Sequence, residues 1–179
     1  VAVYQSTCSL MESGNGLSYG AKKRRSNFDC LVEGRLDQTL AQAWGGYMDA
    51  GDWDRRIQHL RASRYLLELA EMFPRRFSAL ALNIPKEHPD LPDIVSEALF
   101  NLDFYRRMQT PDGGIRGGIE SSDHPRRGEA SWEESLDVLA YAPGIWSSHW
   151  YAGAAARAAL LLGDSHPDLA REYERSALA

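Results

Sequence analysis

Apolar residues at helical spacing constrain the fold of this chain more than any other feature. Segments 53–73 and 91–108 carry apolar side chains about three to four residues apart, the pattern of helices with one buried face. An alanine-rich segment (146–162) and an amphipathic segment (166–179) follow. Pro74 is expected to end the first helix. Since no segment shows convincing strand-type alternation, the sequence predicts an all-α fold.

Composition limits the class of protein. The 179 residues are enough for one domain with a substantial core, and 44% of them are hydrophobic. A net charge of −5 argues against a nucleic-acid groove. No run of 18 apolar residues occurs, so no membrane partner is expected. No signal peptide is visible after Val1, and the last helix has no stop signal, so we expect a processed or truncated chain.

The two cysteines leave the compartment open. Cys8 and Cys30 can form a disulfide or remain two reduced thiols. They show no C-x-x-C spacing and do not form a metal site by themselves. No metal ligands are therefore assigned.

A short stretch from Trp44 to Arg56 carries the most specific chemistry. Asp49 and Asp52 stand three residues apart, with small residues between them and glycines before them. Glycine lets the backbone turn where a Cβ would clash, which helps two acids to face one point. Flat aromatic rings beside carboxylates suit a sugar, which has an apolar C–H face and a polar rim. The candidate substrate-binding aromatics here are Tyr47 and Trp53.

The same two acids also have structural explanations. Asp52 can cap the following helix by accepting a hydrogen bond from its first free N–H groups. Asp49 can stabilise a turn through its own backbone. Spacing alone does not choose between these roles and catalysis.

The stretch from Gly45 to Trp53 resembles the Gly-Gly-x-x-Asp-Ala-Gly-Asp-(Tyr/Trp) signature of glycoside hydrolase family 9, the inverting cellulase-type enzymes. The resemblance implies that Asp52 is the catalytic base and that Asp49 helps to hold the attacking water. Asp123-His124 and Trp132 resemble a second, looser segment of that family. There the histidine bonds the sugar and the tryptophan lines the cleft, so His124 and Trp132 become candidate substrate contacts.

The resemblance also implies an (α/α)6 barrel, of which this chain would hold roughly the first half. Residues 1–179 would form the N-terminal part of a single catalytic domain. Residues 1–40 would be an irregular entry segment, with a short helix in 1–10, and residues 41–179 would be the helical barrel portion.

The implied activity is inverting hydrolysis of β-1,4-glycosidic bonds in a glucan. This reaction needs a base and an acid about 6.5–9.5 Å apart. The family's acid is a glutamate near the end of the domain, beyond residue 179, so we expect this chain to be catalytically incomplete. Four glutamates within the chain lack motif support: Glu120, Glu129, Glu133 and Glu134.

No cofactor is required, and no EF-hand-type loop supports the structural calcium found in some family members. The expected partner is a β-linked oligo- or polysaccharide, with an appended sugar-binding or Ig-like module outside this chain. Secretion or a periplasmic location is implied, because polysaccharides are too large to enter a cell.

Other functions remain open. One is an exo-acting β-glucosidase or glucosaminidase of the same family. Another is a catalytically incomplete, carbohydrate-binding helical module. A third is a different (α/α)-barrel sugar enzyme, such as a lyase, although Asp-Ala-Gly-Asp argues against it. The exact glycan and the oligomeric state are not predicted.

Overall fold

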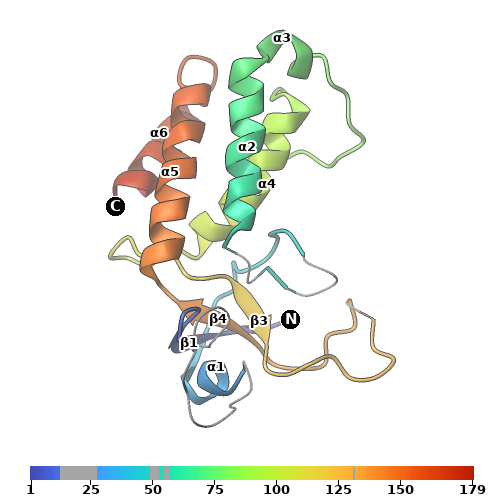
Figure 1. Cartoon of the computed structure of the whole chain (residues 1–179), viewed down its shortest axis with the longest axis vertical. Helices are drawn as coiled ribbons and strands as arrows, with labels where there is room; N and C mark the ends of the chain where they lie inside the picture. The colour runs from blue at the N-terminus through green and yellow to red at the C-terminus, as the bar shows by residue number, and fades with distance from the viewer. Residues whose placement is uncertain (13–27, 49–52, 55–56, 131) are drawn as a thin grey trace.

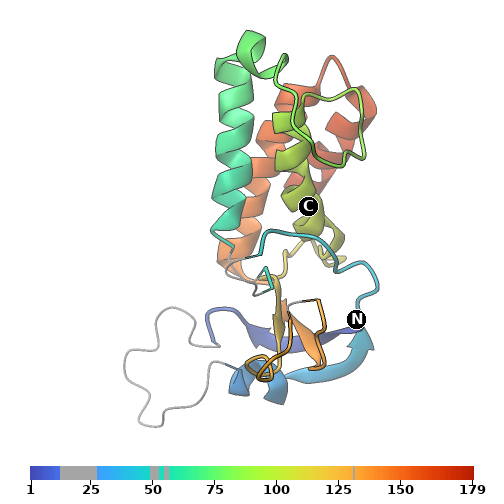
Figure 2. The ribbon, with the colours of Figure 1, turned by 90° about the vertical axis from the view of Figure 1, so that its right-hand side faces the viewer.

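The computed structural model describes residues 1–12, 28–48, 53–54, 57–130 and 132–179. These residues form two layers, a group of helices standing over a small β-sheet (Figure 1). The turned view in Figure 2 shows the same separation.

The helical layer confirms the periodicity of the sequence. Its long helices are α2 (His59–Met72), α4 (Asp93–Arg107), α5 (Ile145–Leu162) and α6 (Pro167–Leu178). As predicted, α2 ends before Pro74, which begins the short helix α3 (Pro74–Phe77). Helix α2 starts several residues later than expected, with Gln58 at its N-cap position.

The second layer is a four-stranded sheet that the sequence analysis did not predict. Its strands are β1 (Val3–Ser9), β2 (Arg35–Thr39), β3 (Ile119–Ser121) and β4 (Val138–Ala142), in the order β2-β1-β4-β3. β1 and β4 are parallel, and the other two pairs are antiparallel.

The prediction of an all-α chain built as part of an (α/α)6 barrel is therefore wrong. The expected helix in residues 1–10 is strand β1. The expected irregular segment 1–40 contains strands β1 and β2 together with helix α1 (Asp29–Glu33). Residues 41–179 likewise contain strands as well as helices.

Burial on both faces of β4 explains why its strand pattern was missed. Val138 and Ala140 belong to the large core shared with the helices, whereas Leu139 and Tyr141 pack with Leu31 of α1. Such a strand reads as a continuous apolar run rather than an alternation. Its partner β1 lies more than a hundred residues away in sequence, so no local signal announces the pairing.

The described residues of the motif segment, 44–48 and 53–54, lie where the two layers meet. After β2, residues 40–48 run between the sheet and the lower ends of the helices (Figures 1 and 2). The Ile119 N–H of β3 donates a 2.9 Å hydrogen bond to the Asp54 carbonyl. This bond attaches the motif segment to the sheet immediately before α2.

Asp93 fixes the start of α4, the helix that supplies much of the core. Its buried carboxylate accepts a 2.7 Å hydrogen bond from Lys86 Nζ and another from the Leu82 N–H. The Lys86 hydrogen bond is the main cause that lowers the pKa of Asp93, and the Leu82 bond adds to it.

We predict that Asp93→Asn lowers the free energy of unfolding more at neutral pH than in acid. A carboxyl with a lowered pKa in the folded state stabilises the fold above its unfolded pKa, and this stabilisation is lost as pH falls through the folded pKa. Urea unfolding at about pH 6 and about pH 3 should therefore show a gap between wild type and variant that narrows in acid. An equal gap at both pH values would contradict this account.

Candidate active site

Two glycines shape the start of the motif. Gly45 and Gly46 have φ values of 94° and 82°, in the left-handed region that favours glycine. A Cβ on Gly46 would lie 2.8 Å from Asp54 Cβ and 2.9 Å from Phe104 Cδ1. Glycine therefore allows the chain to approach both Asp54 and helix α4.

Asp54 follows the signature directly and is buried, with only 1% of its surface exposed. Its Oδ2 accepts a 2.8 Å hydrogen bond from the Tyr47 N–H. Its Oδ1 accepts a 2.9 Å bond from the Tyr105 hydroxyl and lies 3.3 Å from His59 Nδ1. Asp54 thereby links residue 47 directly to residue 54.

The predicted catalytic residues Asp49 and Asp52 fall between these two positions in the sequence, but they lie outside the described residues. Their roles therefore stay predictions. The N-cap of α2 is Gln58, so the alternative in which Asp52 caps this helix is wrong.

Trp53 ties the motif segment to the sheet side of the molecule. Its indole Nε1–H lies 2.9 Å from Ser121 Oγ and 3.0 Å from Glu134 Oε2. The Glu134 Oε1 in turn accepts a 2.8 Å hydrogen bond from the Leu136 N–H. The polar edge of the predicted sugar-binding Trp53 is thus directed at protein groups.

Tyr47, another predicted sugar-binding residue, is also held by the protein. Its hydroxyl donates a 2.8 Å hydrogen bond to the Glu97 carbonyl of α4. Its ring centroid lies 6.2 Å from those of His59 and Phe100. Burial is the main cause that raises the pKa of Tyr47, so the phenol stays protonated at neutral pH.

His124 and Trp132 lie on the long connection between β3 and β4, which extends beside the sheet (Figure 1). The exposed His124 ring meets the Phe28 ring edge-on at 5.0 Å, and Trp132 is 85% exposed. Through Glu134, the same connection reaches Trp53. The contact between Trp53 and Glu134 thus joins the two predicted sugar-binding segments, while the assigned sugar contacts stay predictions.

Sequence reasoning missed the residues that frame the motif. Asp54 follows the signature directly but has no role in it, and Tyr105 lies within segment 91–108, where the sequence indicates only a helix with a buried face. Ser121 and Glu134 gave no local signal, because their contact with Trp53 depends on the fold.

The other three candidate acids each accept a hydrogen bond from a nearby backbone N–H group. Glu129 accepts a 3.2 Å hydrogen bond from the Arg126 N–H, and Glu133 a 2.9 Å bond from the Ala130 N–H. Both therefore stabilise turns of their own loop. Glu120 is buried on β3 and accepts a 2.9 Å hydrogen bond from the Ser121 N–H.

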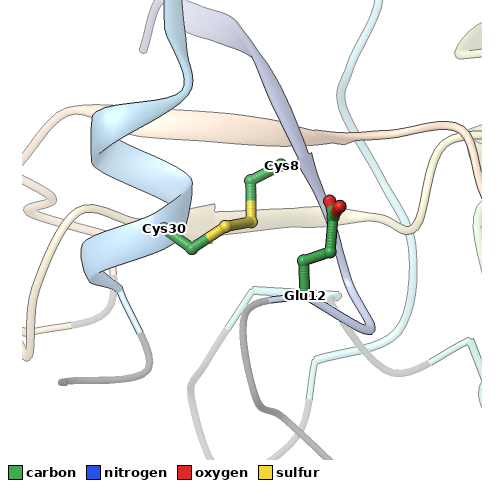
Figure 3. Close-up of side chains that lie close together, drawn as sticks. All are labelled: Cys8, Glu12 and Cys30. Atoms are coloured by element: carbon green, nitrogen blue, oxygen red, sulfur yellow. A yellow bond between two sulfur atoms is a disulfide. The ribbon is translucent and has the colours of Figure 1, made fainter. Parts of the chain in front are cut away.

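Within the described ranges, one group of possible metal ligands has donor atoms within 4.8 Å of one another: Cys8, Glu12 and Cys30. Cys8 and Cys30 form a disulfide with Cα atoms 5.8 Å apart, which resolves the alternatives left open by the sequence (Figure 3). Disulfide sulfurs are not thiolates, and thiolates are the form that binds metals. The group therefore does not offer a cysteine metal site in this state.

No helix in the described part of the chain combines the length and apolar character needed to cross a bilayer.

Comparison of sequences finds relatives among the endoglucanases, although no family model matches the chain. A xyloglucan-specific endo-beta-1,4-glucanase of Bacteroides ovatus is 35% identical over 79 residues, covering 43% of this chain and 14% of the relative. Endoglucanase D of Acetivibrio thermocellus is 27% identical over 141 residues, covering 78% of this chain and 22% of the relative. The chain thus spans less than a quarter of either relative.

Comparison of structures extends the similarity over most of the chain. An endoglucanase from Alicyclobacillus acidocaldarius superposes with a TM-score of 0.70 at 22% identity, over 80% of this chain and 27% of that one. A metagenome-derived glycoside hydrolase family 9 endoglucanase gives 0.66 at 22% identity, over 97% of this chain and 28% of that one.

The described fold is therefore the fold of one part of a glycoside hydrolase. Together with the sequence relatives, it confirms the resemblance seen in the motifs. The chain is thus similar, in sequence and in fold, to a portion of glycoside hydrolase family 9 endoglucanases.

We predict that Gly46→Ala is far more damaging than Gly128→Ala. Gly128 also has a positive φ (86°), but a Cβ there would meet nothing within 4 Å. Gly128→Ala should cost about 1 kcal/mol of unfolding free energy from the left-handed backbone alone. Gly46→Ala adds overlap with Asp54 and Phe104, so its cost should reach about 3 kcal/mol or more.

Chemical denaturation of both variants measures this difference. Because both substitutions add one methyl group at a positive φ, the comparison isolates the close approach at Gly46. Equal losses in the two variants would show that this approach does not matter.

Proposed function

We propose that this chain is part of an inverting glycoside hydrolase that cleaves β-1,4 linkages in a glucan, with Asp52 as general base and Asp49 orienting the attacking water. The observation that carries the proposal is the loop of residues 47–54, which holds both aspartates by sequence and is closed by the buried Asp54. The endoglucanase names of the relatives support the substrate class.

The chemistry sets what this loop has to provide. An inverting enzyme needs an ionised base on one side of the sugar ring, with room for one water, and an acid on the other side. A loop fixed at both ends can hold a base and a water-orienting acid in a constant relation, whereas a free loop would have to order itself in every turnover.

Aromatic residues near the loop support a sugar substrate. Trp44 is 51% exposed, and the Arg107 guanidinium stacks 3.8 Å from its ring centroid. We assign sugar contacts to Tyr47, Trp53, His124 and Trp132. An appended sugar-binding or Ig-like module outside these residues belongs to the same proposal.

A secreted or periplasmic location fits this proposal. The Cys8–Cys30 disulfide suits an oxidising compartment, where disulfides persist. A polysaccharide substrate would be met in the same place.

The catalytic acid is expected on a glutamate outside these 179 residues. Because the chain spans only 14–28% of the length of the relatives described above, activity is best tested in the longest natural form of the protein.

We predict that Asp52→Ala in that form lowers kcat on a soluble β-1,4-glucan about a thousandfold or more, equivalent to roughly 4 kcal/mol of barrier. The reason is that no other group would deprotonate the attacking water. Reducing-sugar release measures kcat, and Asp164→Ala, on the turn after α5, is the control expected to keep wild-type activity.

The products separate this proposal from its alternatives. Inversion predicts that α-anomers appear first from a β-glucan, as followed by NMR. A rapid fall in viscosity indicates internal cleavage, whereas release of single sugars without that fall indicates exo action. Full activity in Asp52→Ala would rule out the base assignment, and tight glucan binding without any hydrolysis would favour the binding module.

A further inference from the structure

We propose that Asp54 is a positioning residue for this reaction: its buried carboxylate joins residues 47 and 54, the two ends of the stretch that holds Asp49 and Asp52 by sequence, and so sets the turnover rate without touching the sugar. This inference rests on the proposed function, because Asp49 and Asp52 belong to the loop that Asp54 closes. Its basis is the set of contacts made by Asp54 and its neighbours in the described residues.

The carboxylate bridges the two ends of the loop. Its Oδ2 accepts the Tyr47 N–H at 2.8 Å, so the backbone at residue 47 is held directly by the side chain of residue 54. Gly46 allows this contact, since any Cβ there would overlap Asp54. The six residues between these anchors include both predicted catalytic acids.

The anchor at Asp54 is itself fixed from both layers of the fold. Tyr105 of α4 donates to Oδ1 at 2.9 Å, and His59 of α2 lies 3.3 Å from the same oxygen. From the sheet, the Ile119 N–H of β3 donates to the Asp54 carbonyl at 2.9 Å. A shift of Asp54 would therefore strain contacts with two helices and one strand.

A rigid anchor matters because hydrolysis depends strongly on geometry. A displacement of about 1 Å at the reacting groups, even from a distant change, can cost on the order of 100-fold in rate. Substrate affinity depends on many contacts along the glycan, so loss of this anchor should lower kcat more than it raises KM.

Asparagine has the same shape but is a weaker anchor than this carboxylate. Both Asp54 oxygens accept hydrogen bonds, one from an N–H and one from an O–H. An amide offers one accepting oxygen, so with the Tyr47 N–H on that oxygen its NH2 group would face the Tyr105 hydroxyl, which would have to turn from donor to acceptor, and both hydrogen bonds would lose the negative charge that strengthens them. Burial, and then the charge of Asp54, raise the pKa of Tyr105, so its hydroxyl stays protonated and keeps donating.

The test compares Asp54→Asn with Asp93→Asn in the longest natural form of the protein. Asp93 is a matched control, because it is also a buried carboxylate that accepts one backbone N–H, but at the start of α4. We expect Asp54→Asn to lower kcat about 10- to 100-fold on soluble β-1,4-glucan with KM within about twofold of wild type. Asp93→Asn should lose stability and keep kcat.

Binding provides an independent readout. The Kd for a cello-oligosaccharide is measured by calorimetry in Asp52→Ala and in the double variant Asp52→Ala/Asp54→Asn, where hydrolysis does not interfere. Equal Kd values together with the loss of kcat in Asp54→Asn support positioning. A large loss of affinity in the double variant contradicts it, since Asp54 would then shape the binding site itself.

Tyr105→Phe covers the case in which Asp54→Asn does not fold, because it removes one donor and keeps the ring. Its kcat should fall about three- to tenfold with KM unchanged, a smaller loss than for the carboxylate. A wild-type kcat in Tyr105→Phe, or in a folded Asp54→Asn, overturns the positioning role. If Asp52→Ala is inactive in the same experiment, the proposed function still stands. Full activity in Asp52→Ala, or an inactive wild type, overturns the proposed function and the positioning role with it.

Discussion

One buried residue, Asp54, joins the two layers of this molecule beside its most specific motif, through its carboxylate to the helices and through its backbone carbonyl to the sheet. Removing a charge from water is costly unless hydrogen bonds compensate, so the groups around Asp54 have to be held in place for the fold to tolerate it. Tyr105 and the Tyr47 N–H supply those bonds, and His59 completes the surroundings. The positions of Tyr47 and Asp54 and the packing of α2 against α4 are consequently linked.

The sheet makes this arrangement possible. Parallel pairing of β1 with β4 brings the N-terminal segment beside residues 138–142, and β3 pairs on the other side of β4. β3 then supplies the Ile119 N–H to Asp54 and the Ser121 hydroxyl to Trp53. The sheet, which the sequence analysis did not predict, therefore holds Asp54 and Trp53 of the motif in place.

Much of the helical layer could be predicted from the sequence, because α2, α4, α5 and α6 have local signals: apolar spacing, a proline near the start of α4, and Pro74 after α2. The sheet could not be predicted from the sequence. β4 is buried on both faces and resembles a short apolar run, and β2 is exposed along its whole length, so neither shows the alternation that marks a half-buried strand. The long-range pairings that define the sheet have no local signature.

The candidate site likewise has a part that could be predicted from the sequence and a part that could not. The signature from Gly45 to Trp53 is recognisable because the proposed chemistry demands particular residue types at fixed spacing, and Gly46 is explained by its approach to Asp54. The framing residues Tyr105, Ser121 and Glu134 are distant in sequence. The comparisons show the same contrast, since identity of 22% accompanies a TM-score of 0.70. A fold can be retained through many substitutions that preserve volume and pattern, whereas a reacting carboxylate tolerates few, so short motifs remain readable where the frame around them does not.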